Sequence, residues 1–274
     1  MGASFTTARS QLMARTLFTP SSRRAPLVHA ATFAVLLGLL GTGSAASAAE
    51  GDHVIVGLGA AHLPRYKGSD ERETKPVPLI DVQKGRFFAR TDAGIGLNVY
   101  QNAYLTVGAS VNWMKGYKEE DAPAGFGEVK DALGGRVFVA TRLGGALLTV
   151  SATQALTATE RGLQFDARLS YPWRATERLT IVPSVAVSAG NAKYMNSYFG
   201  VDQTRALRSG LPQYQMKAGV KEATVGLLAN YRLTDRWAVT GGLVAGQLLG
   251  DAADSPIVKR KSAATGIVGL RYAF

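Results

Sequence analysis

The sequence contains no cysteine and only three histidines, His29, His53 and His62, in 274 residues. Without cysteine, neither a disulfide framework nor a thiolate metal site can form. No apolar run is long enough to cross a membrane as a helix, although 46% of the residues are hydrophobic. Glycine, by contrast, is abundant at 31 residues. This composition is typical of β-rich proteins whose strands are apolar on one face, as the strands of membrane barrels are.

The formal net charge of +11 admits partners that carry phosphate or other anionic groups. A nucleic-acid partner would call for a basic helix or an aromatic RNA-binding motif, and the sequence contains neither. We therefore expect no nucleic-acid partner. The phosphates of lipopolysaccharide, or anions in a pore, fit the same charge.

Residues 1–48 have the pattern of a secretory signal peptide. A basic leader without acidic residues ends at Arg23-Arg24, an apolar core runs from Ala30 to Leu40, and Ala46-Ser47-Ala48 forms an A-x-A cleavage site. Either Met1 or Met13 could be the start of translation. We expect the mature protein to occupy residues 49–274 as one domain beyond the inner membrane.

The last stretch, from Ser262 to Phe274, alternates in steps of two. Ala264, Gly266, Val268, Leu270, Tyr272 and Phe274 form an apolar face, and the other face is small or charged except for Ile267. About ten residues of this kind are enough for a tilted strand to cross a bilayer. The stretch resembles the closing strand of bacterial outer-membrane barrels, whose final residues, here Leu270, Tyr272 and Phe274, serve as the signal for the barrel-assembly machinery.

From His53 onward the same period predicts about twelve antiparallel strands in pairs. Short connections near residues 83–85, 101–102, 144–145, 175–177 and 234–236 alternate with connections at 64–75, 92–93, 116–130, 157–161, 191–220 and 249–261. An even number of strands places both termini at the end with the short turns. A soluble lipocalin-like barrel has the same period with inverted faces, but aromatic residues near strand ends favour a membrane barrel.

Strand parity places several arginines on the inner face, because a charge that faces lipid at mid-bilayer costs roughly 2–4 kcal/mol. The predicted inward arginines are Arg86, Arg90, Arg136, Arg142, Arg168, Arg232 and Arg271. Asp166 and Glu222 are the acids expected beside them. These arginines either pair with acids and fill a small lumen, or they form a cationic interior that favours anions.

Short motifs concentrate in the predicted long connections. They comprise Tyr66, Gly68, Ser69 and Asp70; Tyr198, Phe199 and Gly200; Ser209, Gly210, Leu211, Pro212 and Tyr214; and Gly250, Asp251, Asp254, Ser255 and Pro256. With the signal peptide and the terminal phenylalanine, this set resembles the MipA/OmpV family of outer-membrane proteins, also called MltA-interacting proteins. The resemblance covers essentially all of the mature chain.

The resemblance implies an outer-membrane barrel without catalytic residues. The resemblance implies, from the name-giving member of the family, a scaffold for a lytic transglycosylase and a murein synthase, whereas other members resemble porins or adhesins. Glycine, serine and aspartate in the motifs suit tight turns that fold over the barrel mouth. Asp70, Asp251 and Asp254 could instead bind a divalent cation.

An enzyme is not indicated by the sequence. Only His53 and His62 remain as bases after signal removal, their odd spacing puts them on opposite faces of a regular strand, and neither lies in a G-x-S-x-G context. H-E-x-x-H is also absent, so we expect no catalytic metal and no cofactor. The leading hypothesis is a non-catalytic envelope scaffold associated with peptidoglycan enzymes in the Gram-negative outer membrane. A narrow anion-leaning porin and a surface adhesin are the alternatives.

Overall fold

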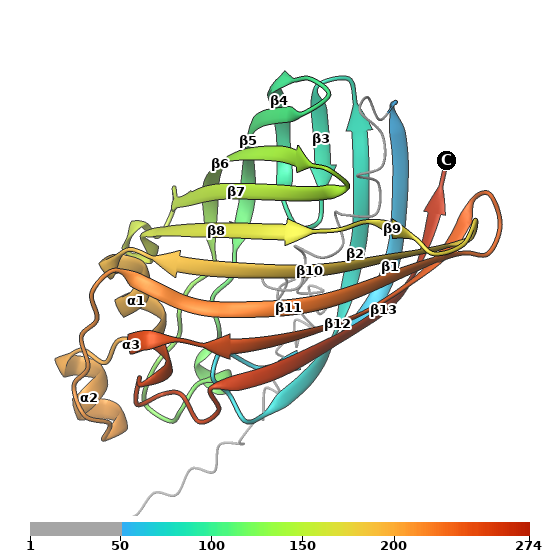
Figure 1. The fold of residues 1–274 in the computed structure, drawn as a ribbon. Coiled ribbons are helices and arrows are strands. Elements are labelled where there is room, and N and C mark those ends of the chain that lie inside the picture. The colour runs from blue at the N-terminus through green and yellow to red at the C-terminus, as the bar shows by residue number, and fades with distance from the viewer. Residues whose placement is uncertain (1–50) are drawn as a thin grey trace, which may run out of the picture.

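The fold was obtained as a computed structural model, which describes residues 51–274. The predicted signal peptide at residues 1–48 lies outside this range. One antiparallel sheet of thirteen strands closes on itself, because β10 pairs with both β8 and β11. The short β9 lies after β8 along the same neighbour, so twelve strands surround the barrel and the predicted fold is confirmed (Figure 1). The strands are β1 (His53–Pro64), β2 (Arg72–Lys84), β3 (Phe87–Arg90), β4 (Gly94–Gln101), β5 (Leu105–Met114), β6 (Ala132–Leu143), β7 (Ala146–Ala155), β8 (Leu163–Ser170), β9 (Trp173–Arg174), β10 (Leu179–Gly190), β11 (Gly219–Arg232), β12 (Trp237–Leu248) and β13 (Ser262–Ala273).

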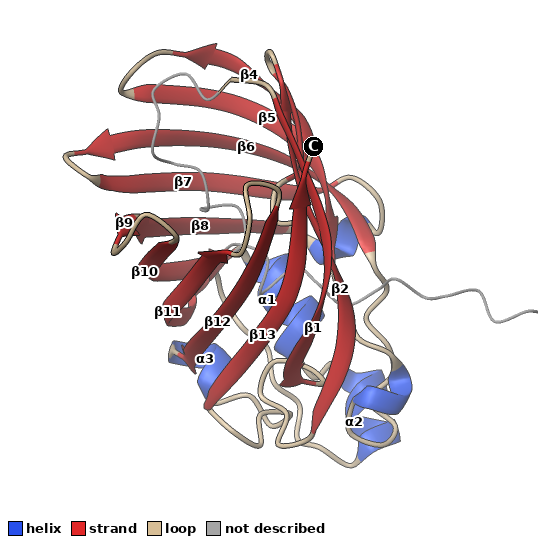
Figure 2. Ribbon diagram, turned by 90° about the vertical axis from the view of Figure 1, so that its right-hand side faces the viewer, coloured by secondary structure: helices blue, strands red, loops and turns tan. Residues whose placement is uncertain are grey.

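Short turns and long loops lie at opposite ends of the barrel, as the spacing predicted. The long loops contain α1 (Ala192–Phe199), α2 (Gln203–Ser209) and α3 (Gly250–Ala253), which gather at one end (Figure 2). Two short 3-10 turns, Glu119–Asp121 and Thr159–Arg161, belong to the same end. Among residues 51–274, no helix is long and apolar enough to cross a membrane.

The outer face of the barrel is apolar and open. Leu58, Ile95 and Leu243 are 65%, 73% and 67% exposed, and exposed valines, leucines and aromatics recur at alternate positions of nearly every strand. Exposed apolar surface of this extent is unfavourable in water at about 25 cal/mol per Å². The outer face therefore fits a hydrocarbon environment. On β13, Leu270 belongs to this face, Tyr272 packs edge-on against Phe274 with ring centres 4.9 Å apart, and Phe274 is 80% exposed.

Part of the lumen is a packed apolar core. Ile267, which breaks the alternation of β13, is buried with Leu79, Val182 and Leu228 from β2, β10 and β11. Small residues on the facing wall make room for these side chains: a Cβ at Gly269 would lie 2.6 Å from Cδ1 of Leu79. Side chains from β1, β2, β10, β11 and β13 therefore fill this part of the interior. The polar lumen is lined by β4–β8 together with other parts of β10–β13.

The wall is incomplete beside β2. This strand pairs with β1 along its whole length, but β3 pairs only with residues 81–84. Thr91 bonds both backbone groups of Ile80, donating its N–H to the carbonyl at 3.0 Å and accepting from the N–H through its hydroxyl at 2.6 Å. Successive residues of a strand direct their N–H groups to opposite sides. Pro78 and Pro76 therefore face the same unpaired side as Ile80, and proline has no N–H to leave unsatisfied there.

We expect Pro78→Ala to destabilise the folded barrel in a bilayer. The substitution introduces an N–H that faces the unpaired edge, and a buried donor without an acceptor costs about 1–3 kcal/mol. Chemical denaturation of the reconstituted protein measures this loss. Pro123→Ala, in the loop between β5 and β6, is the matched control for the added flexibility of the unfolded chain. A gain in stability for Pro78→Ala would mean that an acceptor lies beside the edge.

Candidate functional site

A cavity of about 420 Å³ runs inside the polar half of the barrel. It extends from Asn102 and Tyr104 beside the short turns to Arg260 and Lys261 beside the long loops. Ten basic residues line it: Arg65, Lys67, Arg90, Lys115, Arg136, Arg142, Arg168, Lys221, Arg260 and Lys261. Four acidic residues do so: Asp81, Asp92, Asp166 and Glu222. The lining therefore carries an excess of positive charge, which favours anions over cations.

Four of the seven predicted arginines line this cavity, namely Arg90, Arg136, Arg142 and Arg168. Arg271 points inward on β13 but is buried outside the cavity lining. Arg86 is exposed in the turn between β2 and β3. Arg232 is exposed at the end of β11, where its Nη2 donates to the Glu177 carbonyl at 2.9 Å. Strand parity predicts that Arg86 and Arg232 point inward, but it does not show that they lie at a turn and at a strand end, beyond the enclosed lumen.

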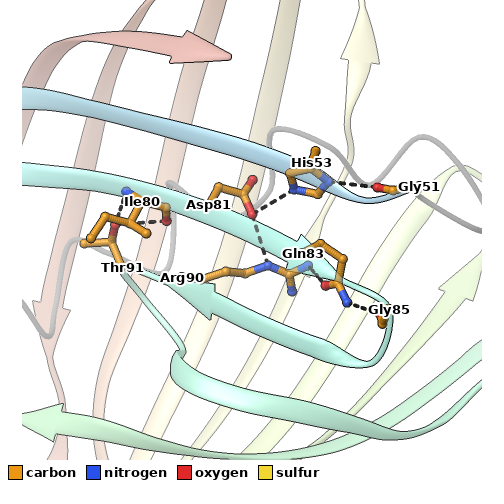
Figure 3. A network of polar contacts seen from close by, with 8 residues as sticks. All are labelled: Gly51, His53, Ile80, Asp81, Gln83, Gly85, Arg90 and Thr91. Carbon is orange, nitrogen blue, oxygen red and sulfur yellow. Dashed lines mark hydrogen bonds and ion pairs between the residues drawn. The ribbon is translucent and has the colours of Figure 1, made fainter. Parts of the chain in front are cut away.

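Asp81 organises the polar contacts near the short turns (Figure 3). Its Oδ1 accepts a hydrogen bond from Arg90 Nε at 3.2 Å and lies 3.3 Å from His53 Nε2. Arg90 also donates through Nη2 to Gln83 Oε1 at 3.1 Å. Strand parity predicts Asp166 and Glu222 as inward acids, and both line the cavity, but Asp81 is not among the predicted residues. The signal was available, because Asp81 shares the parity of Val77, Leu79 and Gln83 on β2.

The wall formed by β6–β8 carries further lumen charges. Arg136 donates to Ser151 Oγ at 3.3 Å, and Asp166 accepts from Ser188 Oγ at 2.6 Å. Arg168 lies within the electrostatic influence of Asp92 and Asp166 but donates no hydrogen bond within residues 51–274. A guanidinium without a hydrogen-bond partner in a cavity can bind a carboxylate or a phosphate. Whether these arginines select anions stays a prediction.

The three loops that carry the motifs meet over the long-loop end and, with the neighbouring loops, form a cap. Sixteen buried residues make its apolar core: Tyr66, Met114, Tyr117, Phe126, Val129, Ala132, Ala155, Tyr194, Met195, Phe199, Val201, Met216, Leu248, Ala252, Ala253 and Ile257. They come from elements far apart in the sequence. The loop 191–218, with α1 and α2, therefore folds over the mouth together with the other loops (Figure 2).

Hydrogen bonds between motif residues hold the cap together. Tyr66 donates to the Ile257 carbonyl at 2.9 Å, Ser255 to the Phe199 carbonyl at 2.5 Å, and Tyr214 to the Asp251 carbonyl at 2.9 Å. Burial raises the pKa of the Tyr66 phenol to about 12, so this donor keeps its proton at physiological pH.

Glycines and prolines of the motifs shape the same loops. At Gly68, φ is +95° and a Cβ would lie 2.7 Å from Cγ2 of Val258, so only glycine fits. Gly210 ends α2 at a φ of 71°. Ser69 accepts from the Glu71 N–H at 3.1 Å. The remaining motif positions, Gly200, Ser209, Leu211, Pro212, Gly250 and Pro256, lie in or beside α1, α2 and α3.

Arg161 is a central cap residue that sequence reasoning missed. It is 1% exposed, donates to the carbonyls of Lys115, at 2.6 Å, and Lys130, and lies 4.3 Å over the ring of Tyr198. Its role depends on contacts between three separate loops, which no local pattern reveals.

Two of the three carboxylates considered as cation ligands form ion pairs with lysines. Asp70 pairs with Lys259 at 3.3 Å and Asp254 pairs with Lys261 at 2.8 Å. Within the described range, no cluster of three histidine or carboxylate side chains could hold a metal ion. Asp70 and Asp254 therefore act in contacts between loop residues in this structure.

We expect Asp131→Asn to weaken the cap at neutral pH. Burial opposes ionisation, but hydrogen bonds from Lys115, the Gly116 amide and Trp113 outweigh it and lower the pKa of Asp131. A carboxyl group with a lowered pKa stabilises the fold above its unfolded-state pKa of about 3.9 and loses this effect as pH falls through the folded value. The melting temperature should fall by about 2–4 °C at pH 7, as for a loss of about 1 kcal/mol.

The difference in melting temperature between the Asp131→Asn variant and the unmodified protein should vanish in strong acid, where the carboxyl group of Asp131 is protonated. Glu120→Gln, which breaks an exposed pair with Lys118, is the matched control and should leave the melting temperature unchanged. A constant difference at every pH would show that the carboxylate charge is not what stabilises the cap.

Comparison with known proteins agrees with this architecture. A family model described as MltA-interacting protein MipA matches residues 56–274. The chain is 22% identical over 238 residues to a 24 kDa outer membrane protein of Pasteurella multocida, covering 82% of this chain and 91% of that one. It is 25% identical over 246 residues to the MltA-interacting protein of Escherichia coli, covering 86% and 96% of the two chains.

Among solved structures, an outer membrane channel from Pseudomonas putida F1 matches with a TM-score of 0.43 and 12% identity, covering 84% of this chain and 98% of that one. The NanC porin matches with a TM-score of 0.42 and 10% identity, covering 80% and 98%. Because the family model spans most of the chain and the curated relatives are outer membrane proteins, this protein is an outer-membrane β-barrel that belongs to the MltA-interacting protein MipA family.

Proposed function

We propose that this barrel is a non-catalytic envelope scaffold that binds peptidoglycan machinery through its short-turn end. In outer-membrane barrels short turns face the periplasm and long loops face outward. A murein enzyme would therefore meet the end where both described termini lie. The relative named MltA-interacting protein suggests a lytic transglycosylase as the partner.

The observation that carries this proposal is a one-sided basic surface on the short-turn rim. Six exposed basic residues form it, and we call them the basic arc: Lys84, Arg86, Arg174, Arg178, Arg232 and Arg236. They flank three turns that are neighbours around the barrel, since the strands follow the order β10, β11, β12, β13, β1, β2 and β3. The turns at residues 102–104 and 144–145 carry no charge.

The basic arc is not neutralised by ion pairs within the chain. None of its six members forms an ion pair among residues 51–274, although Asp52, Glu177 and Asp235 lie on the same rim. By contrast, the long-loop end pairs Arg65 with Glu71, Lys118 with Glu120 and Arg208 with Glu119. Unpaired charge on one side of a rim suits an acidic partner and steers its approach.

Arg86→Glu with Arg178→Glu should reduce capture of a lytic transglycosylase by at least about tenfold, since reversing charges in an interface turns attraction into repulsion. Neither side chain donates a hydrogen bond in the described structure, so folding should be unaffected. Co-purification from detergent-solubilised envelopes measures the loss. Lys118→Glu with Arg208→Glu, at the opposite end, is the control. Equal capture by both variants would contradict docking at the short-turn rim.

A narrow anion-selective pore is the second candidate, supported by the ten basic and four acidic residues that line the cavity. The cap obstructs the long-loop end, so the unmodified barrel should conduct little in planar bilayers. Arg161→Ala removes the contacts that join three loops of the cap and should give frequent openings. In asymmetric KCl the reversal potential should indicate anion selectivity. Adding Arg136→Ala and Arg168→Ala should reduce that selectivity, whereas cation selectivity would exclude this candidate.

A further inference from the structure

The barrel wall has an opening between β2 and β5 in its long-loop half. Residues 72–79 of β2 have no strand on the β3 side, and residues 112–114 of β5 have none on the β4 side. The short hairpin of β3 and β4 fills only the short-turn half, and the loop between these strands, residues 91–93, borders the opening on that side. A strand needs about 9–11 residues to cross a bilayer, and β3 has four. The opening therefore lies at the level of the hydrocarbon.

The border on β2 is built to stay unpaired. Pro76 and Pro78 remove two of the N–H groups that would face the opening, and their rings belong to the outer face of the strand. Edge prolines prevent the addition of a further strand. A protein segment that pairs with this edge is thus disfavoured, whereas a lipid chain, which needs no hydrogen bonds, is a suitable neighbour.

The opposite border leads into the cavity. Asp92, Ala93, Asn112 and Met114 lie on the border and also line the cavity. Asp92 Oδ1 and Asn112 Oδ1 are buried oxygens without a hydrogen-bond partner among the described residues. Arg136 and Arg168 lie farther inside, close enough for their charges to act on Asp92. A molecule that enters here moves from the apolar environment of the lipid into a polar cavity with an excess of positive charge.

Two other routes into the cavity are obstructed. The cap closes the long-loop mouth with its apolar core. Ala61, Leu63, Val77, Leu79, Val182, Leu228 and Ile267 fill the lumen on the side of β1 and β13. On the remaining circumference, each strand from β5 to β13 and from β13 to β2 is paired with its neighbour.

We propose that this opening is a lateral window that admits an amphiphile with one aliphatic chain and an anionic head. The chain lies in the window beside Pro76, Pro78 and Met114, and the head lies in the cavity near Arg136 and Arg168. The excess of basic side chains in the lining selects a negative head over a neutral one. This site is independent of the basic arc, so docking at the rim and binding at the window can succeed or fail separately.

Tryptophan quenching by brominated acyl chains tests the window directly. The native Trp113, Trp173 and Trp237 are replaced by phenylalanine, and one tryptophan is introduced by Asn112→Trp. Thr224→Trp is the matched control, because Thr224 lines the same cavity on β11, which is paired on both sides. In bilayers with brominated chains, Asn112→Trp should lose several-fold more fluorescence than Thr224→Trp. Equal shielding of both positions would overturn the window.

The head group is tested with dodecyl phosphate that carries a brominated tail, against brominated dodecanol. The phosphate should quench Asn112→Trp saturably and at concentrations at least about tenfold lower than the alcohol. Arg136→Ala with Arg168→Ala should remove that advantage while leaving quenching by bilayer lipid unchanged. Equal quenching by phosphate and alcohol in the parent would overturn the anionic class of ligand.

Heat-modifiable gel mobility confirms that each variant has folded. Because the chain contains no cysteine, a bimane label on Asn112→Cys provides a second probe if the tryptophan variant does not fold. Thr224→Cys carries the same label as its control. The expected and contradictory results are the same as for tryptophan.

Discussion

The pairing of backbone hydrogen bonds constrains every other feature of this barrel. In hydrocarbon no water satisfies an exposed N–H or carbonyl, so each strand must find partners on both edges or lose the groups that need them. The first route operates around most of the circumference, including the closure between β1 and β13. The second operates at the unpaired edge of β2, where Pro76 and Pro78 replace residues that would have directed N–H groups into the gap. The prolines beside the interruption thus allow the wall to be interrupted without leaving their N–H groups unsatisfied.

The lumen satisfies two opposing demands. Packing favours a filled interior, and Leu79, Val182, Leu228 and Ile267 achieve it on one side. Polar side chains need partners, and Asp81, Asp166 and the hydroxyls of β7 and β10 provide them on the other. Because basic residues outnumber acidic ones in the lining, these partners do not cancel the charge. We expect this surplus to give the cavity a preference for anions that a fully paired interior would lack.

Much of this architecture follows from periodicity and turn chemistry. Alternation, which is clearest along β8 and β13, and the spacing of turn residues such as those at 144–145 and 234–236 predict about twelve strands and the two kinds of ends. Strand length was harder, because Phe87 and Phe88 begin a segment whose composition does not reveal that β3 stops at Arg90. Pro76 and Pro78 were the visible sign of an unpaired edge. Prolines restrict the position of a strand, but only the pairing of its neighbours shows which edge is free.

The candidate site was less predictable for a different reason. Parity identifies an inward arginine, as for Arg136 and Arg168, but it does not show whether an acid from another strand lies beside it. Asp92 reaches the lumen from the loop after β3, and Arg161 is central because loops distant in sequence meet around it. Such contacts arise from closure of the barrel. The cleaved leader predicted at residues 1–48 stays a prediction, since it lies outside the described residues.

Within the described part of the chain, charged residues form ion pairs at the long-loop end of the barrel but not in the basic arc of the short-turn rim, and this difference separates the roles of the two ends. At the long-loop end, loops that carry both signs neutralise one another and pack around a common apolar core. Opening that end would require several loops to separate together, so the cap is a poor gate for rapid exchange. At the short-turn rim, the six residues of the basic arc form no ion pair within residues 51–274 and remain available to a partner. Because the window opens through the side of the wall, a ligand could reach the lumen without disturbing either the cap or a protein bound at the rim. A scaffold and a lipid-facing binding site are therefore compatible in one barrel, since they depend on surfaces that do not overlap.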